Sequence, residues 1–88
     1  RPDHAAAHAA LGAAYREQGD YAGARAALER AVELDPGDLR ASYQLGLVYA
    51  KLGDKEGAKK MFARADELRA RERERETVIL KLIDPPQN

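Results

Sequence analysis

Few residues of this sequence have the types and spacing that catalysis or metal binding requires. His4 and His8 stand four residues apart, a spacing at which two imidazoles on one helix can share a metal ion. No further ligand accompanies them, so a zinc site is disfavoured. Ser42 and Thr77 are the only hydroxyl residues besides the tyrosines, and no pattern of His and Asp accompanies them. The sequence therefore predicts no active site, no metal and no cofactor.

Charge and hydropathy also argue against nucleic acid and membrane as partners. Fifteen Lys and Arg residues balance 15 Asp and Glu residues, so no overall field would attract phosphates. The arginines between 69 and 76 each have an acidic neighbour. This pattern disfavours a basic strip that would bind nucleic acid, RNA included. No stretch approaches the roughly 18 apolar residues that a membrane helix needs.

Length and composition predict one small helical domain over residues 1–88. Apolar residues make up 44% of the chain, and alanine supplies much of this share, which suits close-packed helices better than a sheet. The absence of cysteine fits either a reducing or an oxidising compartment. Localisation therefore stays open, with the cytoplasm slightly favoured.

The chain repeats itself at a period of 34 residues, which marks a stacked-repeat architecture. Residues 5–38 align with residues 39–72 without a gap. The identical pairs are Ala7 and Ala41, Leu11 and Leu45, Gly12 and Gly46, Tyr15 and Tyr49, Gly19 and Gly53, Asp20 and Asp54, Gly23 and Gly57, Ala24 and Ala58, Arg30 and Arg64, Ala31 and Ala65, Glu33 and Glu67, and Leu34 and Leu68.

Turn residues divide each unit into two helices. Gly19 can adopt the left-handed conformation that ends a helix, and Asp20 can cap the next one; Gly53 and Asp54 repeat this turn. The segment 35–38 links the units, because its proline stops one helix and its last aspartate can cap another. We expect helices at about 4–18, 21–34, 39–52 and from 55 onward, paired as antiparallel hairpins.

Small residues are expected where the two helices of a hairpin approach each other. Gly12 and Gly46 on the first helices, and Ala24 and Ala58 on the second, leave room for close packing. The expected core around these contacts consists of Leu11, Tyr15, Leu28, Leu34, Leu45, Tyr49, Phe62 and Leu68.

These residues resemble the tetratricopeptide repeat family, whose pattern is Trp-x2-Leu-Gly-x2-Tyr, then Ala-x3-Phe, then Pro. The positions that occupy this pattern are His8, Leu11, Gly12, Tyr15, Ala24, Leu28 and Pro36 in residues 5–38, and Ser42, Leu45, Gly46, Tyr49, Ala58, Phe62 and Ala70 in residues 39–72. His8 and Ser42 replace the family's Trp, Leu28 replaces its aromatic residue, and Ala70 replaces the closing proline.

The resemblance implies an all-α fold in which antiparallel helical hairpins stack as a short right-handed superhelical solenoid. It divides the chain into repeats at 5–38 and 39–72 and a C-terminal helix extension and tail at 73–88. Pro2 lies one period before Pro36, which suggests an upstream repeat, and Ala70 lets the last helix continue, as in the final unit of an array.

The resemblance also implies a concave groove lined by the first helix of each hairpin, which would bind a protein or peptide. The corresponding positions here are Ala6, Ala9, Ala13, Arg16, Glu17, Arg40, Tyr43, Gln44, Leu47, Ala50 and Lys51. A partner helix or an extended apolar peptide fits these residues, with Tyr43 and Leu47 as anchors and Arg16, Arg40 and Lys51 at the rim. The alternative is a structural segment at the end of an array that packs against other domains of its parent protein.

A long final helix is expected because no glycine or proline interrupts the chain between Gly57 and Pro85. Arginine and glutamate at spacing three between 69 and 76 suit an exposed helix. Val78, Ile79, Leu82 and Ile83 then fall on one helical stripe, which predicts a homodimer or another protein contact. Two alternatives remain: a short strand over 78–83, and a bend that folds the stripe back onto its own chain.

Overall fold

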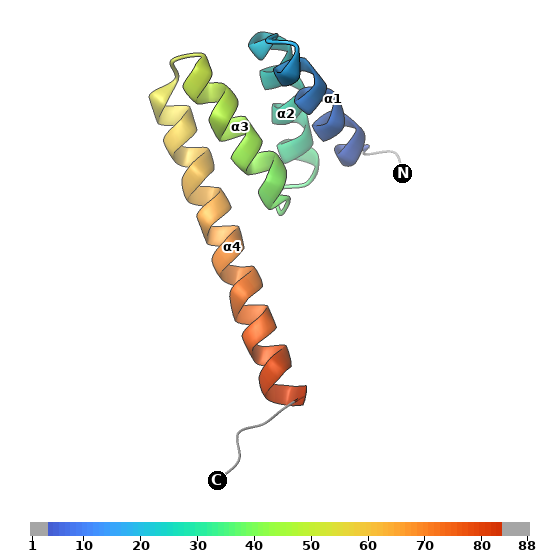
Figure 1. Ribbon diagram of the computed structural model, residues 1–88, viewed down its shortest axis with the longest axis vertical. Coiled ribbons are helices and arrows are strands. Elements are labelled where there is room, and N and C mark those ends of the chain that lie inside the picture. Colours follow the sequence, from blue (N-terminus) through green and yellow to red (C-terminus); the bar gives the residue numbers. More distant parts are fainter. Residues whose placement is uncertain (1–3, 84–88) are drawn as a thin grey trace.

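Within residues 4–83, which the computed structural model describes, the chain forms four α-helices and no strand. The helices are α1 (Ala5–Glu17), α2 (Tyr21–Leu34), α3 (Leu39–Lys51) and α4 (Lys55–Ile83). Helices α1 and α2 form one antiparallel hairpin (hairpin 1), α3 and α4 form a second (hairpin 2), and α2 packs against α3 (Figure 1). The expected all-α stack of helical hairpins is confirmed.

The two hairpin turns have the same backbone structure. Gly19 and Gly53 adopt positive φ angles of 81° and 83°, as their places after the first helix of each hairpin predicted. The N–H of Asp20 donates to the carbonyl of Tyr15 at 2.9 Å, and the N–H of Gly19 donates to that of Arg16 at 3.0 Å. These two bonds form a Schellman motif, and the turn at Gly53 repeats it.

An aspartate caps each helix that follows a turn. Asp20, Asp38 and Asp54 accept the N–H of Gly23, Ala41 and Gly57 respectively, at distances between 2.9 and 3.1 Å. Each cap satisfies a backbone donor that the first helical turn leaves without a partner, an effect of about 1 kcal/mol. The three aspartates therefore set where α2, α3 and α4 begin.

Close helix approach within each hairpin depends on a glycine. A Cβ atom added to Gly12 would lie 2.5 Å from Cγ of Leu28, and one added to Gly46 would lie 2.6 Å from the ring of Phe62. Leu28 and Phe62 stand one period apart, so both hairpins use the same contact of a bulky side chain on a glycine backbone. Gly12 and Gly46 thus have the packing function that the sequence predicted.

The core lies mainly between the hairpins. Ala24 and Leu28 of α2 form a buried cluster with Leu45 and Val48 of α3, and Met61 of α4 packs against this cluster. Two polar contacts join the hairpins at its edge. The hydroxyl of Tyr49 donates to Oε2 of Glu29 at 2.6 Å, and the guanidinium of Arg64 donates to the carbonyl of Pro36 at 2.9 and 3.1 Å.

One expectation about a side chain was wrong. Leu11, expected in the core, is 48% exposed because no described element covers its side of α1. In the charged stretch of α4, which is exposed as expected, Arg69 pairs with Asp66 and Arg71 pairs with Glu67, each one turn back along the helix. Both ion pairs are exposed and contribute little to stability.

Helix α4 extends well beyond the rest of the molecule. It continues without a break to Ile83, so the segment 78–83 is helical and the strand alternative was wrong. Residues 69–83 are all exposed and project past the body as a straight rod (Figure 1). The bend that would bury the apolar stripe within the chain is absent from the described residues.

We expect Gly12→Ala to lower the free energy of unfolding by about 1 kcal/mol. Overpacking against Leu28 costs about 1–3 kcal/mol, and the better helix propensity of alanine offsets about 1 kcal/mol of that. Urea denaturation followed by helical circular dichroism measures the change. Ala10→Gly, at an exposed position of the same helix, calibrates the propensity effect. A Gly12→Ala protein more stable than the wild type would show that α1 and α2 do not need this close approach.

We expect Tyr49→Phe to destabilise the stack by about 1 kcal/mol at neutral pH, because the bond to Glu29 is lost. Burial raises the pKa of the Tyr49 phenol from 10.0 to about 12, and the hydrogen bond to Glu29 acts in the same direction. A raised folded pKa means that this stabilisation is complete below pH 10.0 and is lost as pH rises toward about 12.

The difference in unfolding free energy between wild type and Tyr49→Phe should therefore shrink across that pH interval. Urea unfolding at several pH values tests this, and Tyr15→Phe is the matched control, since Tyr15 is the equivalent residue of hairpin 1. A difference that stays constant from pH 8 through the interval above pH 10.0 would contradict the assignment.

Candidate functional site

Helices α1 and α3 present the candidate binding surface, and two pockets lie between them. The first pocket, of about 330 Å³, is bordered by the N-terminal halves of both helices. The second, of about 450 Å³, lies where both helices end. The pockets share one face of the stack, because the α2–α3 contact sets α1 and α3 next to each other. We call this surface the α1–α3 groove.

Nine of the eleven positions expected to line the groove border these pockets. The first pocket is lined by Ala6, Ala9, Arg40 and Gln44. The second is lined by Arg16, Glu17, Leu47, Ala50 and Lys51. Helical spacing explains the grouping, since Arg40, Gln44, Leu47 and Lys51 recur at steps of four, three and four residues along α3.

The other two groove residues lie elsewhere. Ala13 is half-buried on α1 and borders neither pocket. Tyr43, expected as an anchor, turns toward α4, where its ring packs on Phe62 with 5.6 Å between the ring centroids. It stays 44% exposed at the flank of the groove. Leu47 is thus the one large apolar side chain of α3 that borders a pocket.

Sequence reasoning missed some of the lining residues. Tyr21, the first residue of α2, borders the second pocket because the tight turn at Gly19 brings it beside the end of α1. Asp38 and Ala10 border the first pocket. A signal for Tyr21 existed, because an aromatic residue directly after a helix cap must lie near the preceding helix end.

The electrostatics of the groove are set at its two ends. Arg16 and Lys51 occupy the last turns of α1 and α3, where the helix dipole favours a cation. Glu17 joins them at the second pocket. At the first pocket Arg40 stands beside Asp38, whose carboxylate caps α3. Alanine and Leu47 lie between these charges, so the groove has an apolar middle and charged ends.

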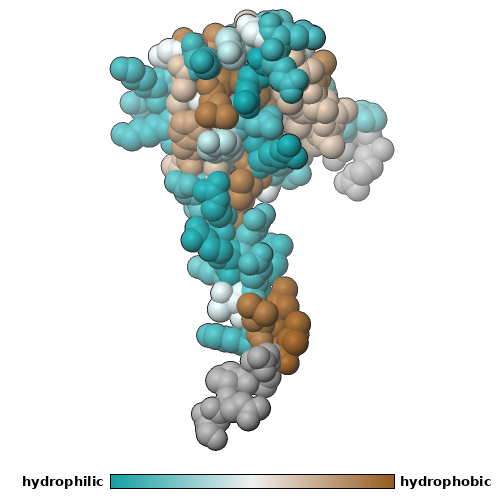
Figure 2. All heavy atoms as spheres, in the orientation of Figure 1, coloured by the Kyte–Doolittle hydropathy of each residue, from teal (hydrophilic) through white to brown (hydrophobic). Residues whose placement is uncertain are grey.

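The apolar stripe at the end of α4 is a second candidate surface. Val78, Ile79, Leu82 and Ile83 are between 47% and 78% exposed. Figure 2 shows a brown, hydrophobic patch near the end of α4, separated from the two hairpins by a hydrophilic stretch of the helix. Leu80 is also exposed but lies off this stripe.

The residues that could bind a metal or take part in catalysis are considered last. Among residues 4–83 there is no group of three or more His, Cys, Asp or Glu side chains that could hold a metal ion. His4 precedes α1 in a left-handed conformation without a side-chain capping bond, and His8 is half-buried on α1. Ser42 is fully buried on α3. No helix in this range has the length and apolar character needed to cross a membrane.

Comparisons with known families agree with the repeat structure. A model described as "TPR repeat" matches residues 12–53, and one described as "Tetratricopeptide repeat" matches residues 39–72. Together the matches cover residues 12–72, more than half of the 88-residue chain. A search of curated proteins finds no match. Repeats of this type are generally protein-interaction modules and form a non-catalytic kind of scaffold. The chain belongs to the tetratricopeptide repeat family.

Proposed function

We propose that this protein binds a partner helix or an extended apolar peptide in the α1–α3 groove. The observation that carries the proposal is the pair of pockets that α1 and α3 enclose on one face. A binding site of this kind needs an apolar centre that excludes water and polar groups that orient the ligand. The groove has both, with Leu47 and alanines in its middle and cations at either end.

The charges favour a ligand with carboxylates near its two ends. Arg16 and Lys51 lie at one end of the groove and Arg40 at the other. A peptide with apolar side chains over Leu47 and acidic residues toward these cations would match the groove in hydropathy and charge. Alanine-lined walls leave room for a backbone or a helix rather than for deep side-chain insertion.

The proposal also includes self-association of two copies through the stripe at the end of α4. Each of these apolar side chains contributes about 1.5–3 kcal/mol when fully buried, so leaving them all in water is costly. A second α4 offers a matching stripe of the same length. Contact between the two stripes would bury both of them, because the same surface of each copy meets in a symmetric dimer.

The charge pattern of α4 favours an antiparallel arrangement of these helices. The face that carries buried Leu68 continues at steps of four and three residues through Glu72, Arg75, Ile79 and Leu82. In a parallel pair in register, Glu72 of one helix would face Glu72 of the other, and Arg75 would face Arg75. An antiparallel pair avoids both like-charge contacts and still brings Ile79 against Leu82 of the other copy.

Leu47→Glu should weaken ligand binding in the groove at least about tenfold, because it places a charge in the apolar centre. Peptides selected from a displayed random library on the wild-type protein serve as probes, and titration calorimetry measures their affinities. Leu52→Glu is the matched control, since Leu52 is 41% exposed and borders neither pocket. Selected peptides that bind Leu47→Glu as tightly as wild type would exclude the α1–α3 groove.

Leu82→Lys should convert the dimer into a monomer of 9.7 kDa, whereas Leu80→Lys should leave the dimer intact. Both side chains are exposed on α4, but only Leu82 lies on the stripe. Light scattering after size-exclusion chromatography gives the mass in solution. A wild-type protein that is monomeric at all accessible concentrations, as a chain ending at Glu76 should be, would rule out self-association.

A further inference from the structure

The apolar surface at the end of α4 is wider than the contact between two stripes requires. Leu80 is 64% exposed and extends the stripe of Val78, Ile79, Leu82 and Ile83 around the helix. At about 3.6 residues per turn, these five side chains cover an arc of about 200°. A coiled-coil seam between two helices occupies less than about 100° of each helix. The end of α4 can therefore contact two helices at once.

The α1–α3 groove offers two helices that run in the same direction and have small side chains. Ala6, Ala9 and Ala10 line its first pocket, and Leu47 and Ala50 line its second. Small side chains let the axis of a third helix approach closely. A helix with a wide apolar arc is therefore buried more completely in this groove than against one other helix.

The length of the α4 end also matches the groove, and so does its charge. Arg40 and Lys51 are 11 residues apart on α3. Glu72 and Ile83 are also 11 residues apart on α4, so each pair spans about 16 Å along its helix. In an antiparallel arrangement Glu72 would face Lys51, and the last turn of α4 would lie beside Arg40. Both contacts are favourable, because a cation stabilises a carboxylate and the C-terminal end of a helix dipole.

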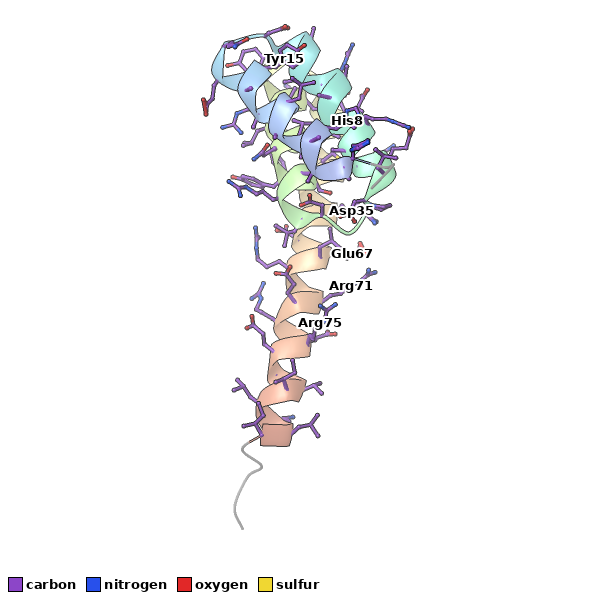
Figure 3. All side chains as sticks on the ribbon, turned by 90° about the vertical axis from the view of Figure 1, so that its right-hand side faces the viewer. His8, Tyr15, Asp35, Glu67, Arg71 and Arg75 are labelled. Carbon is purple, nitrogen blue, oxygen red and sulfur yellow. The ribbon has the colours of Figure 1, made fainter. Side chains whose placement is uncertain are left out.

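The groove of one copy can receive this helix only from a second copy. Helix α4 continues without a break from hairpin 2 to Ile83. Figures 1 and 3 show from two directions that its end stands clear of the hairpins, with Arg71 and Arg75 on the stretch between. A straight helix that leaves the hairpins in this way does not return its own end to their groove.

We propose that the α1–α3 groove binds the end of α4 from a second copy of this chain, antiparallel to α1 and α3. The proposal rests on the proposed binding of a helix in this groove, and it names the occupant. One α4 end cannot pair with another α4 end and fill a groove at the same time, so the two contacts compete. A ligand that fills the groove therefore releases α4 ends to pair with each other.

Two variants that each lack one of the two surfaces test this proposal. Leu82→Lys disrupts the apolar end of α4 and keeps the groove, whereas Leu47→Glu disrupts the groove and keeps the end of α4. When mixed, the two chains should form a 1:1 complex, because one supplies an intact groove and the other an intact α4 end. Pairing of α4 ends alone would leave the Leu82→Lys chain monomeric in the mixture. Sedimentation velocity with a fluorescent label on that chain measures the complex.

A matched pair of further changes locates the contact. Ala50→Glu, added to the Leu82→Lys chain, should weaken the complex at least about tenfold, because Ala50 is exposed and lines the second pocket. Leu52→Glu, added to the same chain, should leave the affinity unchanged, because Leu52 is exposed and borders neither pocket. Equal affinities of these two double variants would overturn the proposal.

A charge exchange tests the antiparallel arrangement. Lys51→Glu in the Leu82→Lys chain should weaken the complex about threefold at low salt, and Glu72→Lys in the Leu47→Glu chain should restore it. A labelled Leu82→Lys chain that sediments as a monomer at every concentration of the Leu47→Glu chain would overturn the proposal. Library peptides that bind the groove in that case would show that only the α4 occupant is excluded and that the ligand site remains.

Discussion

The rest of this structure depends on the contacts that the Leu28 side chain makes. On one side its side chain packs on the backbone of Gly12, and on the other it joins Leu45 and Val48 in the buried cluster. It therefore holds hairpin 1 closed and attaches hairpin 2 at the same time. A chain this short has little other core, so its hairpins cannot be considered independently stable units.

The turns make this packing reproducible. Schellman motifs at Gly19 and Gly53 and the aspartate caps after them give both hairpins the same turn. Because both hairpins then stack in the same way, α1 and α3 come to lie next to each other and enclose the α1–α3 groove. The α1–α3 groove is thus a consequence of turn chemistry and of the α2–α3 contact, and it needs no specialised loop.

Helix α4 divides its length between two tasks. Its first half contributes Ala58, Ala65 and Leu68 to the interior, whereas residues 69–83 are exposed. The charged stretch after Leu68 is hydrophilic, as its exposure requires, and it separates the apolar stripe from the two hairpins. The stripe is thereby placed where a neighbouring chain can reach it without disturbing the hairpins.

The hairpins could be predicted from the sequence, because glycine, proline and aspartate end and cap helices through contacts within a few residues. The period of 34 residues then shows that the same hairpin occurs twice. The sequence also determined the long final helix, since nothing between Gly57 and Pro85 can end it. Tertiary structure decided which apolar residues are buried. Leu11 and Leu45 have the same place in the repeat, and only the neighbouring α2 makes one exposed and the other buried. Likewise Tyr43 packs on Phe62, and Tyr21 joins the groove, because burial depends on the facing helix and not on the residue's own spacing.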